Sequence, residues 1–251
     1  MKRSIYLVLT FLFLILMRVN PALAFQLRPM SQVFAPSGSG ATRTYQIVNN
    51  QEKRIAVEVT VVERQMSLDG AETYQPAEDD FLIYPTQMIL EPGAVQVVRV
   101  SWLGDPLPEQ ELAFRLVAEQ LPINLVDPNQ ANPVQPVGQV QISLRYLGSL
   151  FVRPEGVQAS VQLESAVAHT DSHGAPAIAI TFANTGNGRA SLRDLSVNLT
   201  VQGQTVTLSP EQLKDMTGTT ILPGSSRRYI LAWPETLPQG SITATFNYRQ
   251  D

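Results

Sequence analysis

Residues 90–102 read Leu90-Glu91-Pro92-Gly93-Ala94-Val95-Gln96-Val97-Val98-Arg99-Val100-Ser101-Trp102, a Pro-Gly turn followed by an alternating strand. Counting back in twos from Trp102 puts Val98 and Val100 on one face, because successive strand residues point to opposite sides of a sheet. The same device returns at Leu222-Pro223-Gly224, which leads into a strand ending at Trp233. In both copies the Trp follows the Pro by ten residues. Repeats this far apart indicate duplicated domains, so the sequence predicts two similar β domains.

A second, weaker match supports the duplication, since Ile47-x-Asn49 in the first half corresponds to Phe182-x-Asn184 in the second. The alternative is that two unrelated sandwich strands share a turn and a Trp, because only these few positions match. After residue 25, short alternating apolar runs are separated by Gly, Pro, Asn and Asp, which is typical of an all-β sandwich. These runs cover residues 45–48, 55–61, 95–102, 113–117, 140–152, 177–182 and 242–246.

The boundary between the two domains is expected at Arg153-Pro154-Glu155-Gly156. Pro interrupts a strand ladder and Gly allows a bend, so this segment is a predicted hinge. The predicted domains are therefore residues 25–153 and residues 154–251.

The first residues have the three parts of a secretory signal peptide. Lys2 and Arg3 carry positive charge, Ile5 to Met17 form an apolar run, and Ala22-Leu23-Ala24 offers a cleavage site. The run is shorter than the ~20 apolar residues of a membrane-spanning helix, and an uncleaved anchor is the alternative. We expect residues 1–24 to be removed, so that the mature chain begins at Phe25.

Charge and hydropathy exclude two classes of partner. Loss of Lys2, Arg3 and Arg18 with the signal peptide lowers the formal net charge from −4 to −7. An acidic chain gives no electrostatic support for binding nucleic acid. No second apolar run is long enough to span a membrane, so we expect a soluble protein that is not membrane-embedded.

Groups able to carry catalysis are few. The chain has no Cys, which excludes thiol catalysis and Cys-ligated metals. It also lacks a Gly-x-Ser-x-Gly elbow and a Gly-rich phosphate loop. His169 and His173 flank Asp171 among turn residues, which favours a solvated turn over a weak metal site. A metal-dependent enzyme built on these three residues has no convincing further ligand, so the sequence predicts no enzyme, no cofactor and no metal.

The clearest alternation of side chains follows a long Pro-rich segment at residues 122–139. Val140, Ile142 and Leu144 share one face, and Gln141 and Ser143 share the other. These three apolar residues either point into the domain's own core or belong to an edge strand offered to a partner that lacks one. The pattern alone leaves both interpretations open.

Three further stretches resemble the pilus-assembly periplasmic chaperones of the chaperone–usher family. The first is Tyr84-Pro85-Thr86-Gln87-Met88-Ile89-Leu90-Glu91-Pro92-Gly93-Ala94-Val95-Gln96-Val97-Val98-Arg99-Val100. The second is Glu111-Leu112-Ala113-Phe114-Arg115-Leu116 with Glu119-Gln120-Leu121-Pro122, and the third is Leu150-Phe151-Val152-Arg153-Pro154. The resemblance is good over residues 25–154 and faint beyond them.

The resemblance implies a fold, a location and a role. The fold is two immunoglobulin-like β-sandwich domains set at an angle, and the location is the periplasm. In the implied role, Val140, Ile142 and Leu144 fill the groove of an incomplete pilin subunit until an outer-membrane usher takes the subunit over. Glu119 and Arg153 match family positions that help to hold the interdomain angle, although the usual acidic third partner has no evident match in the second domain.

The chain departs from the best-known branch of the family at the residues that anchor the pilin's terminal carboxylate. Ser31 and Ser149 stand where that branch has an Arg and a Lys. The pattern Phe114-Arg115-Leu116 instead resembles the archaic branch, which implies that Arg115 is the anchor. A guanidinium group grips a carboxylate through two parallel hydrogen bonds. Arg99 and Arg145 are the next candidates, and the alternative for Arg115 is an ordinary surface charge.

A different class of function is a structural or adhesive surface protein made of two sandwiches. Such a protein would use its sheet edges for permanent assembly. The runs from Arg43 to Val152 supply enough strands for a complete first sandwich plus a spare strand, which favours the chaperone. The sequence leaves open which pilin and usher are bound and whether free copies pair with each other.

Overall fold

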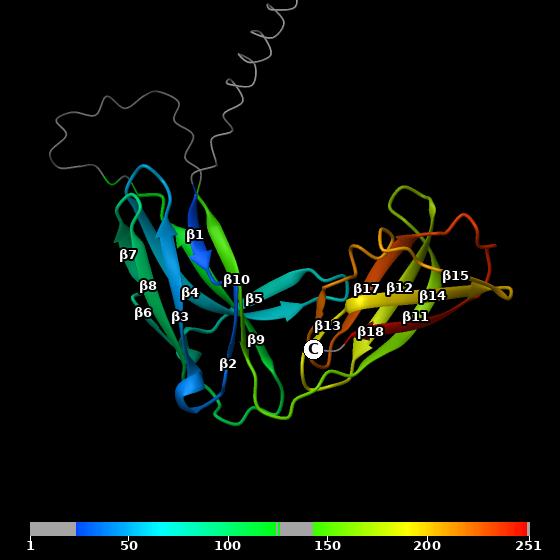
Figure 1. Cartoon of the computed structure of the whole chain (residues 1–251), viewed down its shortest axis with the longest axis horizontal. Coiled ribbons are helices and arrows are strands. Elements are labelled where there is room, and N and C mark those ends of the chain that lie inside the picture. Colours follow the sequence, from blue (N-terminus) through cyan, green and yellow to red (C-terminus); the bar gives the residue numbers. More distant parts are fainter. Residues whose placement is uncertain (1–23, 124, 126–142, 250–251) are drawn as a thin grey trace, which may run out of the picture.

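The computed structural model describes residues 24–123, 125 and 143–249, and Figure 1 shows them as two β-sandwiches set at an angle to each other. Apart from two short 3-10 helices, Gly38–Ala41 (η1) and Glu78–Asp80 (η2), the regular elements among these residues are all strands. The prediction of an all-β fold is confirmed. Within these ranges, no helix is both long enough and apolar enough to cross a membrane.

The first sandwich contains ten strands in two sheets. One sheet has the order β1-β3-β8-β6, and the other has the order β2-β10-β9-β4-β5, with β7 pairing to β4. The strands are β1 Phe25–Arg28, β2 Ser31–Phe34, β3 Thr42–Asn49, β4 Ile55–Met66, β5 Glu72–Pro76, β6 Phe81–Tyr84, β7 Gln87–Leu90, β8 Val95–Trp102, β9 Leu112–Gln120 and β10 Arg145–Val152. Neighbouring strands run antiparallel except β2 and β10, which are parallel.

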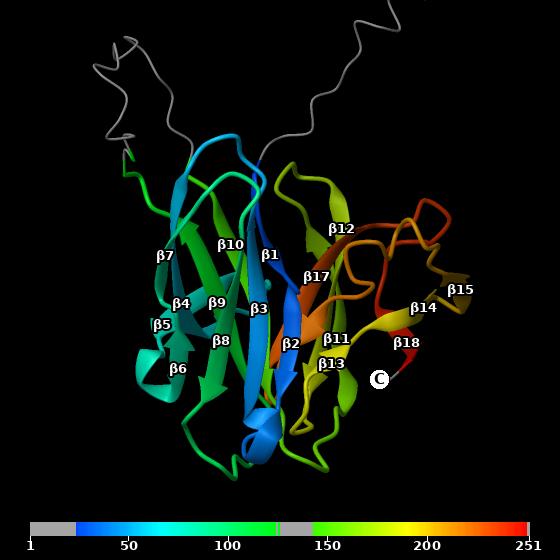
Figure 2. The same cartoon turned by 60° about the vertical axis from the view of Figure 1, so that its left-hand side comes forward.

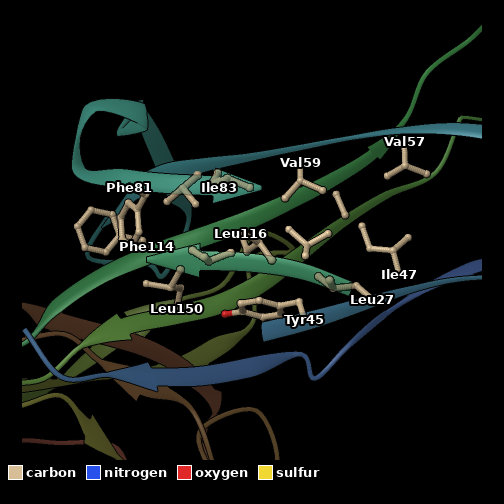
Figure 3. Close-up of a cluster of buried hydrophobic side chains, with 14 of the residues drawn as sticks. Leu27, Tyr45, Ile47, Val57, Val59, Phe81, Ile83, Phe114, Leu116 and Leu150 are labelled. Atoms are coloured by element: carbon tan, nitrogen blue, oxygen red, sulfur yellow. The ribbon is translucent and has the colours of Figure 1, made fainter. Parts of the chain in front are cut away.

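The core of this sandwich lies between its two sheets, where alternate strand residues meet. Figure 3 shows Tyr45, Val59, Phe114 and Leu116 pointing toward one another from strands of both sheets. Val98, Val100 and Trp102, placed on one face by the sequence pattern, are buried in this cluster. Each fully buried apolar side chain contributes about 1.5–3 kcal/mol, so these facing layers hold the sheets together.

The second sandwich is smaller, and Figure 2 shows it beside the first. Its sheets have the orders β11-β12-β17 and β15-β14-β18, with β13 and β16 as a separate pair. The strands are β11 Val161–Thr170, β12 Pro176–Asn184, β13 Ala190–Ser191, β14 Arg193–Val201, β15 Gln204–Thr207, β16 Thr220–Ile221, β17 Ser226–Ala232 and β18 Ile242–Arg249. Its core shares no residue with the first core. The position of the boundary near Arg153 stays a prediction.

The internal repeat is present as three-dimensional structure. In the first domain the buried Asn49 side chain donates hydrogen bonds of 3.0 Å to the carbonyls of Leu90 and Glu91. In the second domain the buried Asn184 side chain donates to the carbonyls of Ile221 and Leu222, at 3.1 and 3.4 Å. Each Asn thus satisfies carbonyls that a turn would otherwise leave unpaired.

In each Pro-Gly turn, the glycine amide also donates a hydrogen bond to the backbone carbonyl of the same asparagine. The Gly93 amide donates to the Asn49 carbonyl at 2.8 Å, and the Gly224 amide donates to the Asn184 carbonyl at 2.9 Å. Both glycines have positive φ values, 74° and 66°, which glycine adopts at little cost. The duplicated turn and asparagine support the interpretation that the two halves are copies of one design.

Candidate functional site

Strand β10 (Arg145–Val152) has an open edge along half of its length. It pairs with β9 from Arg145 to Val152, but with β2 only from Ser149 to Val152. Along Arg145–Gly148, no strand among the described residues pairs with the second edge, because β1 belongs to the opposite sheet. An unpaired edge of this kind can accept a strand from another chain.

Of the three predicted groove-filling residues, only Leu144 belongs to the part of the chain that the structure describes, because Val140 and Ile142 lie outside it. Leu144 is half-buried and packs with Tyr146 against the first-domain core. Its carbonyl accepts a 2.9 Å hydrogen bond from the Gln120 amide, so contact with the β9 side continues beyond the formal end of β10. For Leu144, this placement favours the interpretation that it faces the domain's own core.

The predicted anchor, Arg115, lies in the middle of a cross-strand row. Arg115 on β9 is opposite Ser149 on β10, which is opposite Ser31 on β2. Directly opposite residues of paired strands project from the same face of a sheet, so the three side chains lie side by side. One Arg115 nitrogen, Nη1, lies 2.5 Å from the Ser149 hydroxyl. The structure therefore brings Arg115 next to Ser31 and Ser149, the two positions that the resemblance matches to a basic pair.

Arg115 is not a free surface charge, because it is paired with Glu72 on β5 (Glu72–Pro76). Arg115 Nε and Nη2 donate to the two Glu72 carboxylate oxygens at 2.9 and 2.6 Å. Arg64 Nη2 donates to the same carboxylate at 2.7 Å, and the Tyr74 hydroxyl donates to it at 2.8 Å. Arg64 and Glu72 were not singled out from the sequence.

The pKa values in this cluster follow from burial and from mutual charge. Burial raises the pKa of Glu72, but hydrogen bonds from Arg115 and Tyr74 and the charge of Arg64 outweigh it, so the pKa lies below its usual value of 4.5. Burial, and then the like charge of Arg115, lower the pKa of Arg64. Glu72 is therefore held as a carboxylate between two guanidinium groups.

The other two candidate anchors lie elsewhere. Arg99 is on the exposed face of β8, in the opposite sheet from Arg115. Arg145 is half-exposed and lies 3.5 Å from Glu119 across the β9–β10 pair. The structure does not bring either of them into the cluster with Glu72.

Glu119, one of the two residues predicted to hold the interdomain angle, has its described ion pair within the first domain. Glu119 pairs with Arg145 at the end of β9 that lies away from the second domain. The acidic residue at the junction is Glu111, whose side chain is 1% exposed. Its carboxylate accepts a hydrogen bond from Arg153 Nη1 at 3.0 Å and ion-pairs with the guanidinium of Arg189 from the second domain.

Arg153 lies at the junction, as the resemblance implies. Its Nη2 also donates to the carbonyl of Val157 at 3.1 Å. The partner from the second domain is the cation Arg189 and not the expected acid. The Arg189 guanidinium also packs 3.9 Å above the ring centre of Phe151. One buried acid between two arginines thus joins the domains.

A second contact between the domains is made by the tip of the β4–β5 hairpin, which reaches across to β17 in Figure 1. The Arg228 amide donates to the Leu68 carbonyl at 2.7 Å, and the Arg228 guanidinium binds the Asp69 carboxylate at 2.9 and 3.1 Å. A cleft of about 500 Å³ lies between these two contacts and is lined by residues of both domains, among them Arg64, Trp102 and Leu222.

The two histidines take part in no cluster of metal-binding groups. His169 is an exposed residue of β11, and His173 lies in a turn, where its amide donates to the Asp171 side chain at 2.9 Å. Across residues 24–123 and 143–249, no group of three or more His, Cys, Asp or Glu side chains could hold a metal ion. Asp171 and His173 thus belong to the turn between β11 and β12, and His169 belongs to β11.

Comparison with known families identifies the class of protein. Residues 30–158 match the model of the pili and flagellar-assembly chaperone family, PapD N-terminal domain. The match covers more than half of the chain, which therefore belongs to this chaperone family. The sequence-based prediction of a pilus-assembly chaperone is confirmed. No curated protein sequence matches the chain.

Solved structures of fimbrial chaperones share the two-domain fold. The class 5 fimbriae chaperone CfaA is 13% identical, with a TM-score of 0.54 over 90% of this chain and 100% of that one. The CsuC–CsuE chaperone–tip adhesion subunit pre-assembly complex, from archaic chaperone–usher Csu pili of Acinetobacter baumannii, includes a chain 14% identical, with a TM-score of 0.55 over 85% of this chain and 90% of that one. At these identities the likeness concerns the fold, and it confirms two immunoglobulin-like domains.

Proposed function

We propose that this chaperone captures pilin subunits by adding one of its own strands to them, and that it delivers them to an outer-membrane usher. The observation that carries this proposal is the open edge of β10 along Arg145–Gly148. The edge continues directly from the alternating residues Val140, Ile142 and Leu144. A strand with one free edge and one apolar face can supply both the hydrogen bonds and the side chains that an incomplete sandwich lacks.

The physical need for such a partner is clear. A subunit that lacks a strand exposes an apolar groove and two rows of unpaired backbone groups, and such surfaces aggregate. The two sheets of the first domain already enclose a core, and Leu144 packs against it. In this proposal, Val140, Ile142 and Leu144 fill the subunit's groove, and Leu144 also keeps its contact with the chaperone's own core.

The subunit's terminal carboxylate is assigned to Arg115 in this proposal. Support comes from the row Ser31–Ser149–Arg115, in which a largely buried guanidinium lies beside the two positions that the resemblance matches to the basic pair. Arg99 and Arg145 are weaker candidates, because one lies on the opposite sheet and the other is paired to Glu119.

Export to the periplasm through a signal peptide cleaved after Ala24 belongs to the same proposal. It is supported by Lys2, Arg3 and the apolar run from Ile5 to Met17, since fimbrial chaperones work in the periplasm. The proposal gives the chain a binding role and no enzymatic one.

Co-expression in a bacterial periplasm with the pilin subunit of its own pilus system tests the proposal. We expect a soluble complex with one chaperone and one pilin, and aggregated or degraded pilin when the chaperone is absent. A structural or adhesive surface protein would instead form multimers of itself and leave the fate of the pilin unchanged. That second result would overturn the proposal.

A further inference from the structure

The cluster of Arg64, Glu72 and Arg115 is short of one negative charge. Two guanidinium groups share a single carboxylate, and the three side chains are only 6%, 17% and 16% exposed. Burying a charge is costly unless it is paired, so a buried group of this composition favours one further anion. A second carboxylate would make the cluster neutral.

Glu72 fills the part of Arg115 that binds carboxylates best. The parallel donors Nε and Nη2 both point at Glu72, at 2.9 and 2.6 Å. A carboxylate approaching Arg115 therefore meets only the end-on side, formed by Nη1 and the second N–H of Nη2, and Nη1 already donates to the Ser149 hydroxyl at 2.5 Å. In the free chain, the side-on fork of Nε and Nη2 on Arg115 is occupied by the protein's own carboxylate.

Arg64 has an unused donor with which it could hold Glu72 alone. Its Nη2 binds Glu72 at 2.7 Å, but its Nε is buried and has no hydrogen-bond partner among the described residues. Nε and Nη2 of one guanidinium form the same parallel fork that Arg115 now presents to Glu72. A small movement of Glu72 toward Arg64 would satisfy the orphan Nε and free the fork of Arg115.

We propose that Glu72 stands in for the terminal carboxylate of a pilin subunit, and that binding of the subunit moves Glu72 from Arg115 to Arg64. This exchange rests on the proposed role of Arg115 as the anchor. It leaves two arginines paired with two carboxylates, each through a parallel fork. The free chaperone thus keeps its anchor neutralised, and a subunit without a carboxylate at the correct place does not open it.

The experiment uses acetate as the probe and acetamide as its uncharged control. NMR follows the Nε–H signals of Arg64 and Arg115 in the whole mature chain, with Arg145 as the control because it lies outside the cluster. We expect acetate to shift both cluster signals and to leave Arg145 unmoved, and we expect acetamide to shift none. Glu72→Gln removes the internal competitor, so the acetate concentration at half-effect should fall about tenfold.

Two more variants separate exchange from simple positioning of Arg115 by Glu72. Arg64→Gln leaves Glu72 with no second arginine, so acetate should bind about tenfold more weakly. The double variant Arg64→Gln/Glu72→Gln frees Arg115 and should bind acetate as tightly as Glu72→Gln alone. If Glu72→Gln alone does not fold, the double variant replaces it in the test. It removes one positive and one negative charge, so the net charge of the cluster stays the same.

The outcomes distinguish this proposal from the one on which it rests. If acetate shifts Arg115 but neither variant lacking Glu72 binds it more tightly, Glu72 only positions Arg115 and the exchange is wrong. If acetate shifts no Arg115 signal in any form of the chain, the cluster binds no carboxylate, and the anchor at Arg115 fails with the exchange. Strand addition at β10 would remain unaffected by either result.

Discussion

At the scale of single residues, strand register sets the position of Arg115, and hydrogen bonds to Glu72 occupy two of its donors. Its neighbours in the row, Ser31 and Ser149, carry no charge, so Arg115 is the cation of this row. The sequence indicated Arg115 through a family resemblance. It could not indicate Glu72, which is 43 residues away, because their contact depends on how β5 and β9 both pair with β4.

Replacing Arg115 by Ala should weaken capture of the pilin. Loss of a charge-assisted pair costs about 1.5–3 kcal/mol of binding, roughly ten- to a hundredfold in Kd. The chain should stay folded, because Glu72 keeps its contact with Arg64. A pilin titration with the purified variant measures the change, and Arg99→Ala is the matched control. If Arg99→Ala weakens binding and Arg115→Ala does not, the anchor role moves to Arg99.

The lowered pKa of Glu72 gives a second test at this scale. A carboxyl group whose pKa is lower in the folded than in the unfolded chain stabilises the fold above its unfolded value, here 4.5, and this contribution is lost as the pH falls through the folded pKa. The free energy of unfolding should therefore fall with pH below about 4.5 less steeply in Glu72→Gln than in the unchanged chain. Equal slopes in urea titrations at several pH values would show that Glu72 is not held as described.

At the scale of elements, the strands with strict alternation were predictable, and the partners of those strands were not. The Pro-Gly turns and alternating runs gave β8 and β17 closely, because a strand with one buried face must alternate. The β4–β5 hairpin was not foreseen as an interdomain contact, since Leu68 and Asp69 look like ordinary turn residues. Glu111 was not considered for the interdomain role for a related reason: family matching gives a position along the chain but not the end of β9 at which the second domain lies.

Gly70, at the tip of this hairpin, tests whether the contact holds the domains together. Its φ is +82°, and a Cβ there would come within 2.7 Å of the Arg227 guanidinium. Gly70→Ala should therefore strain the turn by about 1 kcal/mol and displace the Arg227 guanidinium, which loosens the contact between the hairpin and β17. Small-angle X-ray scattering should report a wider spread of interdomain angles. Gly203→Ala, at a positive φ with open space around it, is the control for strain alone.

At the scale of the whole molecule, two cores that share no residue are joined by ion pairs and hydrogen bonds. Glu111, Arg153 and Arg189 form one joint, and the hairpin tip forms the other. The sequence predicted two domains and placed Arg153 at their junction. It could not supply Arg189 or the geometry of the cleft, because contacts between two folded domains leave no periodic signal in either one.

Glu111→Gln should loosen this joint. The change keeps the shape of the side chain but leaves two guanidinium groups without their shared charge, which should cost about 2–3 kcal/mol of folding and domain docking. Calorimetry should show a lower melting temperature, with the transitions of the two domains separating. Glu119→Gln is the matched control and should change little, since exposed ion pairs contribute about 0–1 kcal/mol. The reverse order of effects would restore the interdomain role to Glu119.

The measurement closest to the central claim compares two double variants in the pilin co-expression experiment. Val140→Asp/Ile142→Asp places two charges on the face proposed to fill the subunit's groove, and Gln139→Asp/Gln141→Asp places two charges on the other face. If β10 extends into a donated strand, the first variant captures no pilin, because each Asp would bury an unpaired charge. Its melting temperature should match that of the unchanged chain, and the second variant should capture pilin normally. Two results would contradict strand donation. One is a drop in the melting temperature of Val140→Asp/Ile142→Asp that corresponds to a loss of several kcal/mol in the free energy of unfolding. The other is that this variant still captures pilin.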